Sequence, residues 1–492
     1  MLTNDPQKRP ADVSERYETV IGLEVHCQLL TESKIFASDY NLFGSEPNTN
    51  IGKLTLALPG TLPKLNRKAV ELGIRFGLAC GSSISRKTVF DRKNYFYPDL
   101  PKGYQITQDK APVCVGGGVR IAPRGGEEKV VRLHHAHLEE DAGKSVHDGS
   151  HTDTLLDYNR AGTPLIEIVS EPDLRSAEET GAYLTEIRRI VRYLEISDGN
   201  MEEGSLRADV NISLRPVGQQ AYGTKVEIKN MNSIRNIMRA IEYEQARQAE
   251  LLDRGEAIIQ ETRMYDVDKE RTYGMRLKET LNDYRYFPDP DLSPVIISEE
   301  WLNEIREKMP ALPWEVKEKL VSRYGLPDYD AAVLSDEKEQ AAYFESICAH
   351  TAYFKTASNW MMGPVRSYLN DSGTTISRFP VTAETVAQVV ELIESGLINH
   401  TIASQKLFPA LLENPGQHPS DLARSNNWIQ NSNTGELETL IDEVLGNMPD
   451  KVEAFKKGKK GLLGLFVGEV MKKTGSTADP KLVNQILNKK LN

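Results

Sequence analysis

The chain has 492 residues, of which 27% are charged and 39% are hydrophobic, and its formal net charge is −11. This length predicts about two to four domains with ordinary globular interiors. The negative charge excludes a surface that binds nucleic acid throughout, although a local basic patch is compatible with it. Four widely spaced cysteines, without a close pair of the kind that zinc ribbons use, indicate a reduced, cytoplasmic setting. The first twenty residues contain acids and prolines and no apolar core, and no apolar run approaches a membrane span, so we expect no signal peptide and no membrane partner.

The first ordered element is predicted at residues 20–30. Apolar residues alternate there with Glu24, His26 and Gln28. A period of two is typical of a strand with one buried face. Its other face therefore carries a carboxylate, an imidazole and an amide in a row, which fits either a ligand site or a strand that simply meets water.

Two further segments precede the most acidic part of the chain. Residues 66–79 predict a short helix. In residues 90–104, aromatic residues alternate with Arg92, Lys93 and Lys102. Such a segment could stack on a base and neutralise phosphate, or it could supply core aromatics beside surface charges.

The run at residues 137–144 contains three adjacent carboxylates, Glu139, Glu140 and Asp141. Three like charges repel one another by about 1 kcal/mol per close pair even in water, so we expect positive groups beside them. An ordinary solvated surface is the alternative. The nearby His134, His135 and His137 lack the spacing of zinc hydrolases, and no cysteines accompany them, so we do not interpret them as a zinc site.

The second half of the pattern predicts more strands of the same kind. Residues 165–169 place Glu167 opposite two isoleucines, and residues 206–215 and 225–229 alternate in the same way. Helices are predicted after Ser176 and Ser233, which have the composition of N-caps. Together these elements predict a mostly antiparallel sheet with helices on its apolar face. Its other face is expected to present Glu24, His26, Gln28, Arg207, Asp209, Asn211, Glu227 and Lys229.

This set of side chains differs from an ordinary solvated face. It mixes short carboxylates, an imidazole, an amide and cations, where a solvated face is rich in Lys, Glu and Thr. Magnesium is typically held by one or two carboxylates together with substrate phosphates, and Arg or Lys can bind those phosphates. The residues therefore predict a magnesium–nucleotide site on an open sheet, without a P-loop motif.

Six stretches of the chain resemble the B subunit of the aspartyl/glutamyl-tRNA amidotransferase, and together they span nearly the whole sequence. They are residues 20–26, 90–98, 137–144, 161–168, 201–207 and 283–289. The resemblance implies an α+β protein with a glutamine-synthetase-like, antiparallel-sheet cradle at residues 1–295. It also implies a helical domain at 296–398 and a YqeY-like helical tail at 399–492. The implied reaction is the ATP-dependent amidation of glutamate mischarged on glutamine tRNA, or of aspartate mischarged on asparagine tRNA.

The resemblance also assigns expected roles to residues. Glu24, His26 and Glu140 match metal positions of the family, and Glu139 and Glu227 are nearby candidates for a Mg²⁺ ion. From the chemistry of the side chains, the catalytic set is expected to be Glu140, Arg160, Arg207 and Lys229, which would contact phosphate or carboxylate groups. Binding of the cofactor ATP is expected at Lys93, Asp209 and Asn211.

A source of ammonia is missing from the sequence. The chain has neither a glycine- and serine-rich amidase signature nor a cysteine in a recognisable glutaminase setting. A partner is therefore expected to supply ammonia through a protected channel. The family implies that this partner is the A subunit, which is an amidase, and that the small C subunit completes a heterotrimer.

The C-terminal part of the chain has a different composition. Residues 300–390 read as successive helices, and residues 413–433 read as a linker. The last 42 residues contain ten lysines and three acids, with a cluster at Lys456, Lys457, Lys459 and Lys460. Lysines can bind RNA phosphates without reading bases, so this cluster is expected to bind tRNA; a solvated tail is the alternative. No DNA partner is expected. Two other functions remain open: a stand-alone carboxylate–amine ligase and a non-catalytic protein that binds tRNA.

Overall fold

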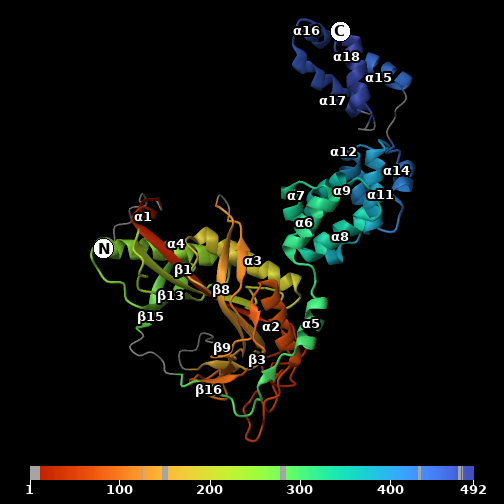
Figure 1. Ribbon diagram of the computed structural model, residues 1–492. Coiled ribbons are helices and arrows are strands. Elements are labelled where there is room, and N and C mark those ends of the chain that lie inside the picture. The colour runs from red at the N-terminus through yellow and green to blue at the C-terminus, as the bar shows by residue number, and fades with distance from the viewer. Residues whose placement is uncertain are drawn as a thin grey trace. The chain divides into compact units, whose positions relative to one another are not determined.

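The computed structural model describes residues 11–123, 126–146, 153–277, 284–429, 434–474, 478 and 480–491. The chain divides into two compact units, residues 1–312 and residues 313–492 (Figure 1). Sheet and helices together form the first unit, and helices form the described part of the second. The predicted α+β class with a helical C-terminal region is confirmed.

A large, mostly antiparallel sheet forms the centre of the first unit (Figure 1). One pair, β13 with β14, is parallel. β7 (Gly118–Ile121) pairs with β8 beside the main path. The strand order along that path is β15 (Arg271–Leu277), β14 (Glu261–Asp266), β13 (Val226–Lys229), β12 (Leu206–Pro216), β1 (Tyr17–Gln28), β11 (Pro164–Ser170), β8 (Lys129–Glu140), β6 (Cys114–Val115) and β2 (Ser83–Ile84).

The strand β1 lies between β12 and β11 and sets the register of the site. Its side chains alternate between buried and half-buried positions from Leu23 to Gln28, as a period of two requires. His26 lies opposite Arg207 on one side and opposite Glu167 on the other. In turn, Glu167 lies opposite His137 of β8. The polar residues of four strands therefore share one face.

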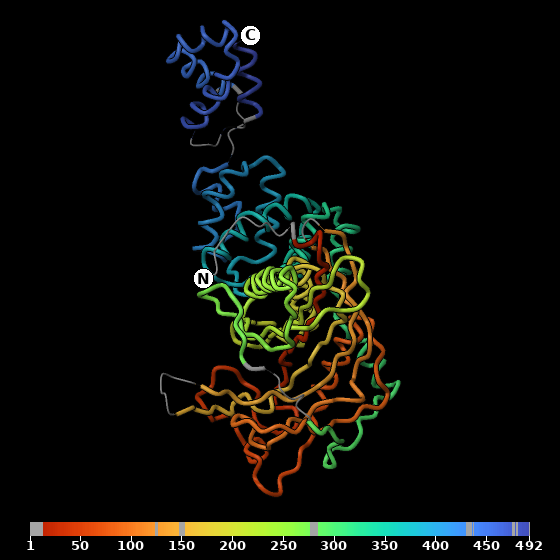
Figure 2. The backbone as a smooth tube through the Cα atoms, turned by 90° about the vertical axis from the view of Figure 1, so that its left-hand side faces the viewer, coloured from red at the N-terminus to blue at the C-terminus, as the bar shows by residue number. Residues whose placement is uncertain are grey.

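Helices cover the apolar face of this sheet, as the ribbon shows (Figure 1). They are α2 (Arg67–Ala79), α3 (Ala177–Tyr193) and α4 (Ile234–Asp253). Each begins at a residue whose side chain accepts a backbone N–H: Asn66, Ser176 and Ser233. These caps satisfy N–H groups that would otherwise lack a partner in the first turn. The tube view shows α4 nearly end-on beside the sheet (Figure 2).

Smaller elements complete the first unit. A separate sheet has the order β16 (Phe287–Pro288), β4 (Asp91–Asn94) and β5 (Tyr104–Thr107). It brings together two segments that are almost 200 residues apart in sequence. The remaining elements are α1 (Ala11–Ser14), β3 (Lys87–Thr88), β9 (Lys144–Val146), β10 (Leu155–Asp157), β17 (Val295–Ile296) and α5 (Glu299–Glu307).

The second unit contains two separate hydrophobic clusters, one from Leu320 to Ala423 and one from Leu437 to Leu491. The stretch expected to be a linker contains the helix α14 (Pro419–Ser425), which begins with a proline at its first position after a His418 cap. None of the described helices is both long and apolar enough to cross a membrane. The helices of this unit are α6 (Pro313–Tyr324), α7 (Asp328–Leu334), α8 (Lys338–Cys348), α9 (Phe354–Trp360), η1 (Met361–Val365), α10 (Arg366–Ser372), η2 (Ile376–Arg378), α11 (Ala383–Glu394), α12 (His400–Ile402), η3 (Ala403–Leu407), α13 (Phe408–Glu413), α14, α15 (Thr434–Gly446), α16 (Pro449–Lys456), η4 (Lys460–Leu462), α17 (Leu463–Lys473) and α18 (Pro480–Leu491).

Candidate functional site

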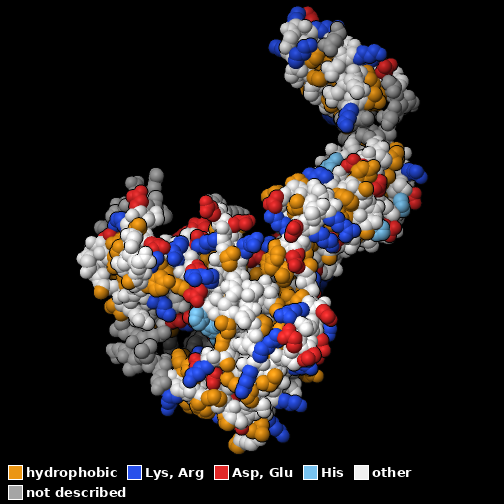
Figure 3. Space-filling view, in the orientation of Figure 1, with side chains coloured by type: hydrophobic (Ala, Val, Ile, Leu, Met, Phe, Trp, Pro, Cys, Tyr) orange, Lys and Arg blue, Asp and Glu red, His pale blue; other side chains and the backbone are white. Residues whose placement is uncertain are grey.

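The polar face of the large sheet gathers acids, imidazoles and cations from five strands. In the space-filling view, histidine atoms lie beside a hollow, with acidic and basic side chains near them (Figure 3). Within the described residues, two groups have ligand atoms that all lie within 4.8 Å of one another. The first group is His26, Glu139 and Glu167, and the second group is Glu24, Asp209 and Glu227.

The first group combines one imidazole with two carboxylates. His26 Nε2 lies 3.2 Å from Glu167 Oε2 and 3.9 Å from Glu139 Oε1. Burial alone would lower the pKa of His26, but the hydrogen bond to Glu167 and the nearby carboxylate charges outweigh burial and raise the pKa to about 9. Burial raises the pKa of Glu167, but His26 and His137 more than reverse this effect and hold it well below its usual range. The Glu167 carboxylate is thus charged and paired with the His26 imidazolium.

A row of histidines leads into this group along β8. His137 Nε2 lies 3.5 Å from Glu167 and 3.6 Å from Glu139. Its Nδ1 lies 3.1 Å from His135 Nε2, and His135 Nδ1 lies 2.7 Å from His134 Nδ1. Burial and the two neighbouring imidazoles lower the pKa of His135 to about 4, so this ring is neutral.

The second group is built from carboxylates of three adjacent strands. Lys229 Nζ lies 2.5 Å from Asp209 and 3.1 Å from Glu227. Asn211 Nδ2 donates to Glu24 at 3.0 Å, and Thr262 Oγ1 donates to Glu227 at 2.7 Å. Burial lowers the pKa of Lys229, but Asp209 and Glu227 outweigh it and raise the pKa above its usual value. One ammonium therefore contacts two of the three carboxyl groups of this second group.

The buried Asp141 holds two arginines at the edge of the site. Its Oδ2 accepts from Arg207 Nη2 at 2.8 Å and from Gln28 Nε2 at 2.9 Å, and Arg160 Nε lies 3.5 Å away. Arg160 also donates to the carbonyls of Ala142 and Gly143, at 3.0 and 2.6 Å. Burial raises the pKa of Asp141, but both arginines more than compensate and lower it. The acid run thus has the positive neighbours that its charge predicted.

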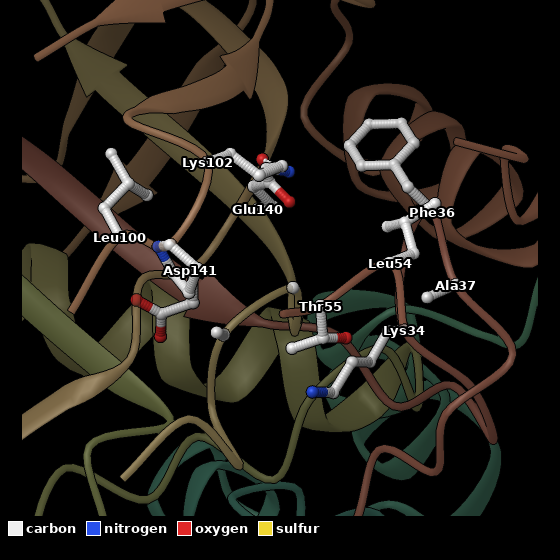
Figure 4. Close-up of a pocket in the computed structure, with 12 residues that line it drawn as sticks. Lys34, Phe36, Ala37, Leu54, Thr55, Leu100, Lys102, Glu140 and Asp141 are labelled. Atoms are coloured by element: carbon white, nitrogen blue, oxygen red, sulfur yellow. Dashed lines mark hydrogen bonds and ion pairs between the residues drawn. The ribbon is translucent and has the colours of Figure 1, made fainter. Parts of the chain in front are cut away.

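Glu140 lies outside both groups. On β8, Glu140 is two residues from Leu138 and therefore shares the side of the strand that faces the hydrophobic core. Glu139 is two residues from His137 and shares its polar side. Glu140 Oε1 accepts from Lys102 Nζ and, at 2.9 Å, from the N–H of Ile106. Lys102 and Glu140 point toward each other, while the carboxylate of Asp141 points away from them (Figure 4). The geometry therefore favours Glu139 over Glu140 as a ligand, because neighbouring residues of a strand point to opposite faces.

The remaining expected site residues are distributed over both units. Lys93 lies at the end of β4, and its charge helps to lower the pKa of Glu167, after the larger effects of burial and the two histidines. The cluster of four lysines lies at the junction of α16 and η4, and all four are exposed. Lys457 lies 2.6 Å from Glu453, and Lys460 Nζ lies 4.5 Å from the ring centre of Phe455.

Both groups fit a divalent cation by the chemistry of their donors. The second group offers only carboxylate oxygens, which suit magnesium, and Asn211 and Thr262 orient two of them. The first group adds one imidazole, a ligand that suits transition metals such as zinc and iron, to two carboxylates, which suit magnesium and manganese. Sequence reasoning did not include Glu167 or Asp209 among the ligands. The signal for Glu167 was present, since its alternation on residues 165–169 placed it on the polar face.

An α+β fold whose sheet face gathers carboxylates, imidazoles and fixed cations is typical of an enzyme. The family described as "GatB/GatE catalytic domain" matches residues 19–303, and the family described as "GatB domain" matches residues 342–491. The B subunit of the aspartyl/glutamyl-tRNA(Asn/Gln) amidotransferase of Alkalilimnicola ehrlichii is 48% identical over 476 residues, which cover 96% of this chain and 99% of the relative. The proteins of the same name from Chlorobium luteolum and Synechococcus elongatus are 48% and 49% identical, and cover 97% and 98% of this chain and 99% of each relative.

The chain belongs to the family of aspartyl/glutamyl-tRNA amidotransferase B subunits, and it is thus a tRNA-dependent amidotransferase of the ligase class. The resemblance noted in the sequence is confirmed. The names of the relatives denote one component of an enzyme that has several different subunits.

Proposed function

We propose that this chain amidates glutamate attached to glutamine tRNA, aspartate attached to asparagine tRNA, or both, at the expense of ATP. ATP transfers its γ-phosphoryl group to the side-chain carboxylate, which gives an acyl phosphate and ADP. Ammonia then forms the C–N bond, the bond from carbon to the phosphate oxygen breaks, and one proton and phosphate leave. This sequence is required because a carboxylate has no adequate leaving group toward ammonia. The observation that carries the proposal is the convergence of two carboxylate groups with Arg160, Arg207 and Lys229 on one sheet face.

We propose Glu24, His26, Glu139 and Glu227 as metal ligands, together with Glu167 and Asp209. A bound Mg²⁺ ion supplies charge neutralisation for the transferring phosphoryl group. Glu140 is proposed to act by holding Lys102, since its carboxylate is already bound by that ammonium.

The arginines are proposed to bind the phosphoryl group or the substrate carboxylate. A guanidinium has five N–H donors, and the contacts of Arg207 and Arg160 with Asp141 and two carbonyls use only some of them. Arg207 Nε is buried and has no hydrogen-bond partner among the described residues. A buried donor without a partner costs about 1–3 kcal/mol, so an acceptor from a substrate would stabilise this arrangement.

The nucleotide is proposed to lie beside the second group. A cavity of about 270 Å³ there is lined by Glu24, Asn211, Tyr222 and residues of β1, β11 and β12. We place the base and sugar of ATP in this cavity, with Asp209 and Asn211 toward the phosphates. Lys93, whose charge helps to lower the pKa of Glu167, is then proposed to face the aminoacyl-tRNA. In this proposed arrangement the γ-phosphoryl group lies between the first group of residues, which contains Glu167, and the second group, which contains Asp209.

A partner is proposed to produce the ammonia. Burial raises the pKa of the Cys27, Cys114 and Cys348 thiols to about 12 and that of Cys80 still further. A glutaminase that uses cysteine needs a readily ionised thiol, and none of these four thiols meets this need. The proposed partners are the amidase, or A, subunit of the amidotransferase and its small C subunit, and the proposed setting is the cytoplasm. Lys456, Lys457, Lys459 and Lys460 are proposed to bind the tRNA backbone.

The test is ATP hydrolysis by the chain, mixed with its partner subunits, with and without glutamyl-tRNA(Gln). We expect mischarged tRNA to stimulate hydrolysis. Glu227→Gln should lower the stimulated rate by at least about 100-fold, because loss of one charge-stabilising group costs about this much, with tRNA affinity nearly unchanged. The matched control is Glu46→Gln, an exposed acid. If the chain were a non-catalytic protein that only binds tRNA, Glu227→Gln and Glu46→Gln would hydrolyse ATP at the wild-type rate. A stand-alone ligase would instead be stimulated by free glutamate without tRNA.

A further inference from the structure

An aromatic wall borders the polar face, and it is made from two segments that are distant in sequence. We define this wall as Tyr95, Tyr284 and Tyr286. The ring centres of Tyr95 and Tyr284 lie 6.1 Å apart, and those of Tyr284 and Tyr286 lie 5.9 Å apart. Asn94 ties the segments together, since its N–H donates to the Tyr284 carbonyl at 2.9 Å and its Nδ2 donates to the Arg285 carbonyl at 2.8 Å. The wall is therefore a fixed structure rather than two independent loops.

The strand that leads into the wall is tied to the first group through β5. Lys93 of β4 lies opposite Gln105 of β5, and Gln105 Nε2 donates to the Glu140 carbonyl at 2.7 Å. Thr107 Oγ1, on the same strand β5, donates to Glu139 Oε2 at 3.1 Å.

Burial raises the pKa of Tyr95, and the negative charge of Glu139 raises it further. The pKa of Tyr286 is raised by burial and by nearby groups that include Glu139 and Glu167. Lys93 packs against the wall, since its Nζ is 5.0 Å from the ring centre of Tyr284 and 5.9 Å from that of Tyr95. Its charge also helps to lower the pKa of Glu167.

Next to the wall, the chain exposes two aromatic side chains to solvent. Phe96 is 94% exposed and Tyr97 is 58% exposed. Burying one such side chain is worth about 1.5–3 kcal/mol, so two adjacent exposed rings beside a polar site indicate a surface that binds something. Gly103 lies next to Phe96, since a Cβ at this glycine would be 3.9 Å from Phe96 Cδ2, and the high exposure of the ring leaves it accessible to a stacking partner.

We propose that Phe96 and Tyr97 form a stacking platform for the unpaired 3′-terminal adenosine of the aminoacyl-tRNA. This inference rests on the proposed function and names how that site receives its substrate. The amino acid is esterified to the terminal ribose, so one residue and one sugar separate the reacting carboxylate from the terminal base. From standard bond lengths this distance is on the order of 10 Å. When the side-chain carboxylate of the substrate lies at the first group, its terminal base therefore reaches the neighbouring wall and the exposed Phe96 and Tyr97.

The chemistry of Phe96, Tyr97 and the neighbouring Lys93 fits a nucleotide better than a protein surface. Aromatic rings stack on any base, at about 1–3 kcal/mol per base, and the ammonium of Lys93 next to them can meet the adjoining phosphate. Arg92 is not available for this role. It lies 4.3 Å from the ring centre of Tyr104 and is paired with Asp289 and Asp291 at 2.8 and 2.9 Å.

The experiment uses glutamyl-tRNA(Gln) with 2-aminopurine as its 3′-terminal base, bound to the complex of this chain with its partner subunits. Stacking quenches 2-aminopurine fluorescence, so the wild-type complex should quench it. Phe96→Ala should reduce the quenching and raise KM for the tRNA by about 5- to 150-fold, the range that removal of one stacked ring predicts, while kcat at saturation stays near that of the wild type. Tyr97→Ala should have the same effect, and Tyr97→Phe should restore stacking. Phe43→Ala, which removes an aromatic side chain that is 70% exposed elsewhere, is the matched control and should change neither quantity.

Two outcomes would overturn the platform. In the first, the wild-type complex amidates normally, and both alanine variants show the same fluorescence quenching and the same KM for the tRNA as the wild type. In the second, the variants lose the partner subunits during purification while the remaining complex still quenches, which would make Phe96 and Tyr97 part of a protein interface. If the wild-type complex quenches but does not amidate, the proposed function fails and the platform stands.

Discussion

Asp141 and Arg207 form the contact that joins the acid run to the sheet face: Arg207 Nη2 donates to Asp141 Oδ2 at 2.8 Å. The carboxylate is 5% exposed, and its pKa is lowered by Arg207 and Arg160 despite the opposing effect of burial. Gly143, two residues later, has no room for a side chain, because a Cβ there would lie 2.9 Å from the Asp99 carbonyl oxygen. Within the acid run, Asp141 thus orients Arg160 and Arg207.

Replacing Asp141 with asparagine should therefore impair turnover more than binding. Asn keeps the shape but loses the charge that orients both guanidinium groups. Displacement of catalytic groups by about 1 Å can lower rates by about 100-fold, so we expect kcat to fall by about this factor with tRNA affinity little changed. Asp173→Asn, which breaks a pair with the 69% exposed Arg132 side chain, is the control and should leave kcat unchanged. Equal kcat values for the two variants would contradict the role of Asp141.

The two glutamates of the acid run should behave differently toward metal. Glu139→Gln should weaken Mn²⁺ binding to the chain, followed by electron paramagnetic resonance without ATP or tRNA, by at least about tenfold, the lower end of what even outer-shell partners contribute. Glu140→Gln should leave Mn²⁺ affinity close to that of the wild type, because its carboxylate binds Lys102 instead. If Glu140→Gln alone weakened Mn²⁺ binding, the assignment by strand face would be wrong.

The buried Lys34 should make stability depend on alkaline pH. It is 1% exposed, and its Nζ has no hydrogen-bond partner among the described residues. Burial lowers its pKa from 10.5 to about 8, although nearby carboxylates oppose this shift. The folded state therefore binds fewer protons than the unfolded state between these values, so stability should rise as pH increases from about 8 toward 10.5.

Lys34→Met tests this prediction. It should raise the free energy of unfolding at pH 7 by up to roughly 3 kcal/mol, at 1.36 kcal/mol per pKa unit, and should abolish the rise at alkaline pH. Urea denaturation at pH 7 and pH 9.5 measures both effects. Lys64→Met, at an exposed lysine, should show neither. A variant less stable than the wild type at pH 7 would mean that the Lys34 ammonium is stabilised in the folded chain.

The lysine cluster should contribute to tRNA binding through charge alone. Replacement of Lys456, Lys457, Lys459 and Lys460 with alanine should weaken binding and reduce the slope of log affinity against log salt by about one for each phosphate that is no longer neutralised. Filter binding at several salt concentrations measures the slope. The same number of exposed lysines replaced in the first unit, at Lys53, Lys64, Lys87 and Lys110, controls for net charge. An identical slope in the wild type and the cluster variant would make the cluster a solvated surface.

The polar faces of single strands could be predicted from the sequence, because a period of two depends only on neighbouring residues. Glu24, His26, Arg207 and Asp209 are half-buried on the predicted face of β1 and β12 for this reason. The pairing of β11 with both β1 and β8 is not local. The place of Glu167 between His26 and His137 therefore could not be derived from alternation alone.

Contacts between distant segments limited the prediction in two further cases. Glu140 was expected in the metal site, but the partner that binds its carboxylate, Lys102, comes from a segment almost 40 residues away. The sequence pattern assigns no role to Asp141, because its arginines lie 19 and 66 residues further on. The domain boundaries at 295/296 and 398/399 and the individual roles of the site residues stay predictions.

The most direct test of the central claim follows oxygen from the substrate carboxylate. Glutamyl-tRNA(Gln) with ¹⁸O in the side-chain carboxylate is incubated with ATP, Mg²⁺, ammonium and the complex of this chain with its partner subunits, and the released phosphate is analysed by mass spectrometry. If the chain activates the carboxylate as an acyl phosphate, one ¹⁸O atom appears in phosphate for each amide formed. Amide formation with phosphate that contains no ¹⁸O would contradict activation through an acyl phosphate.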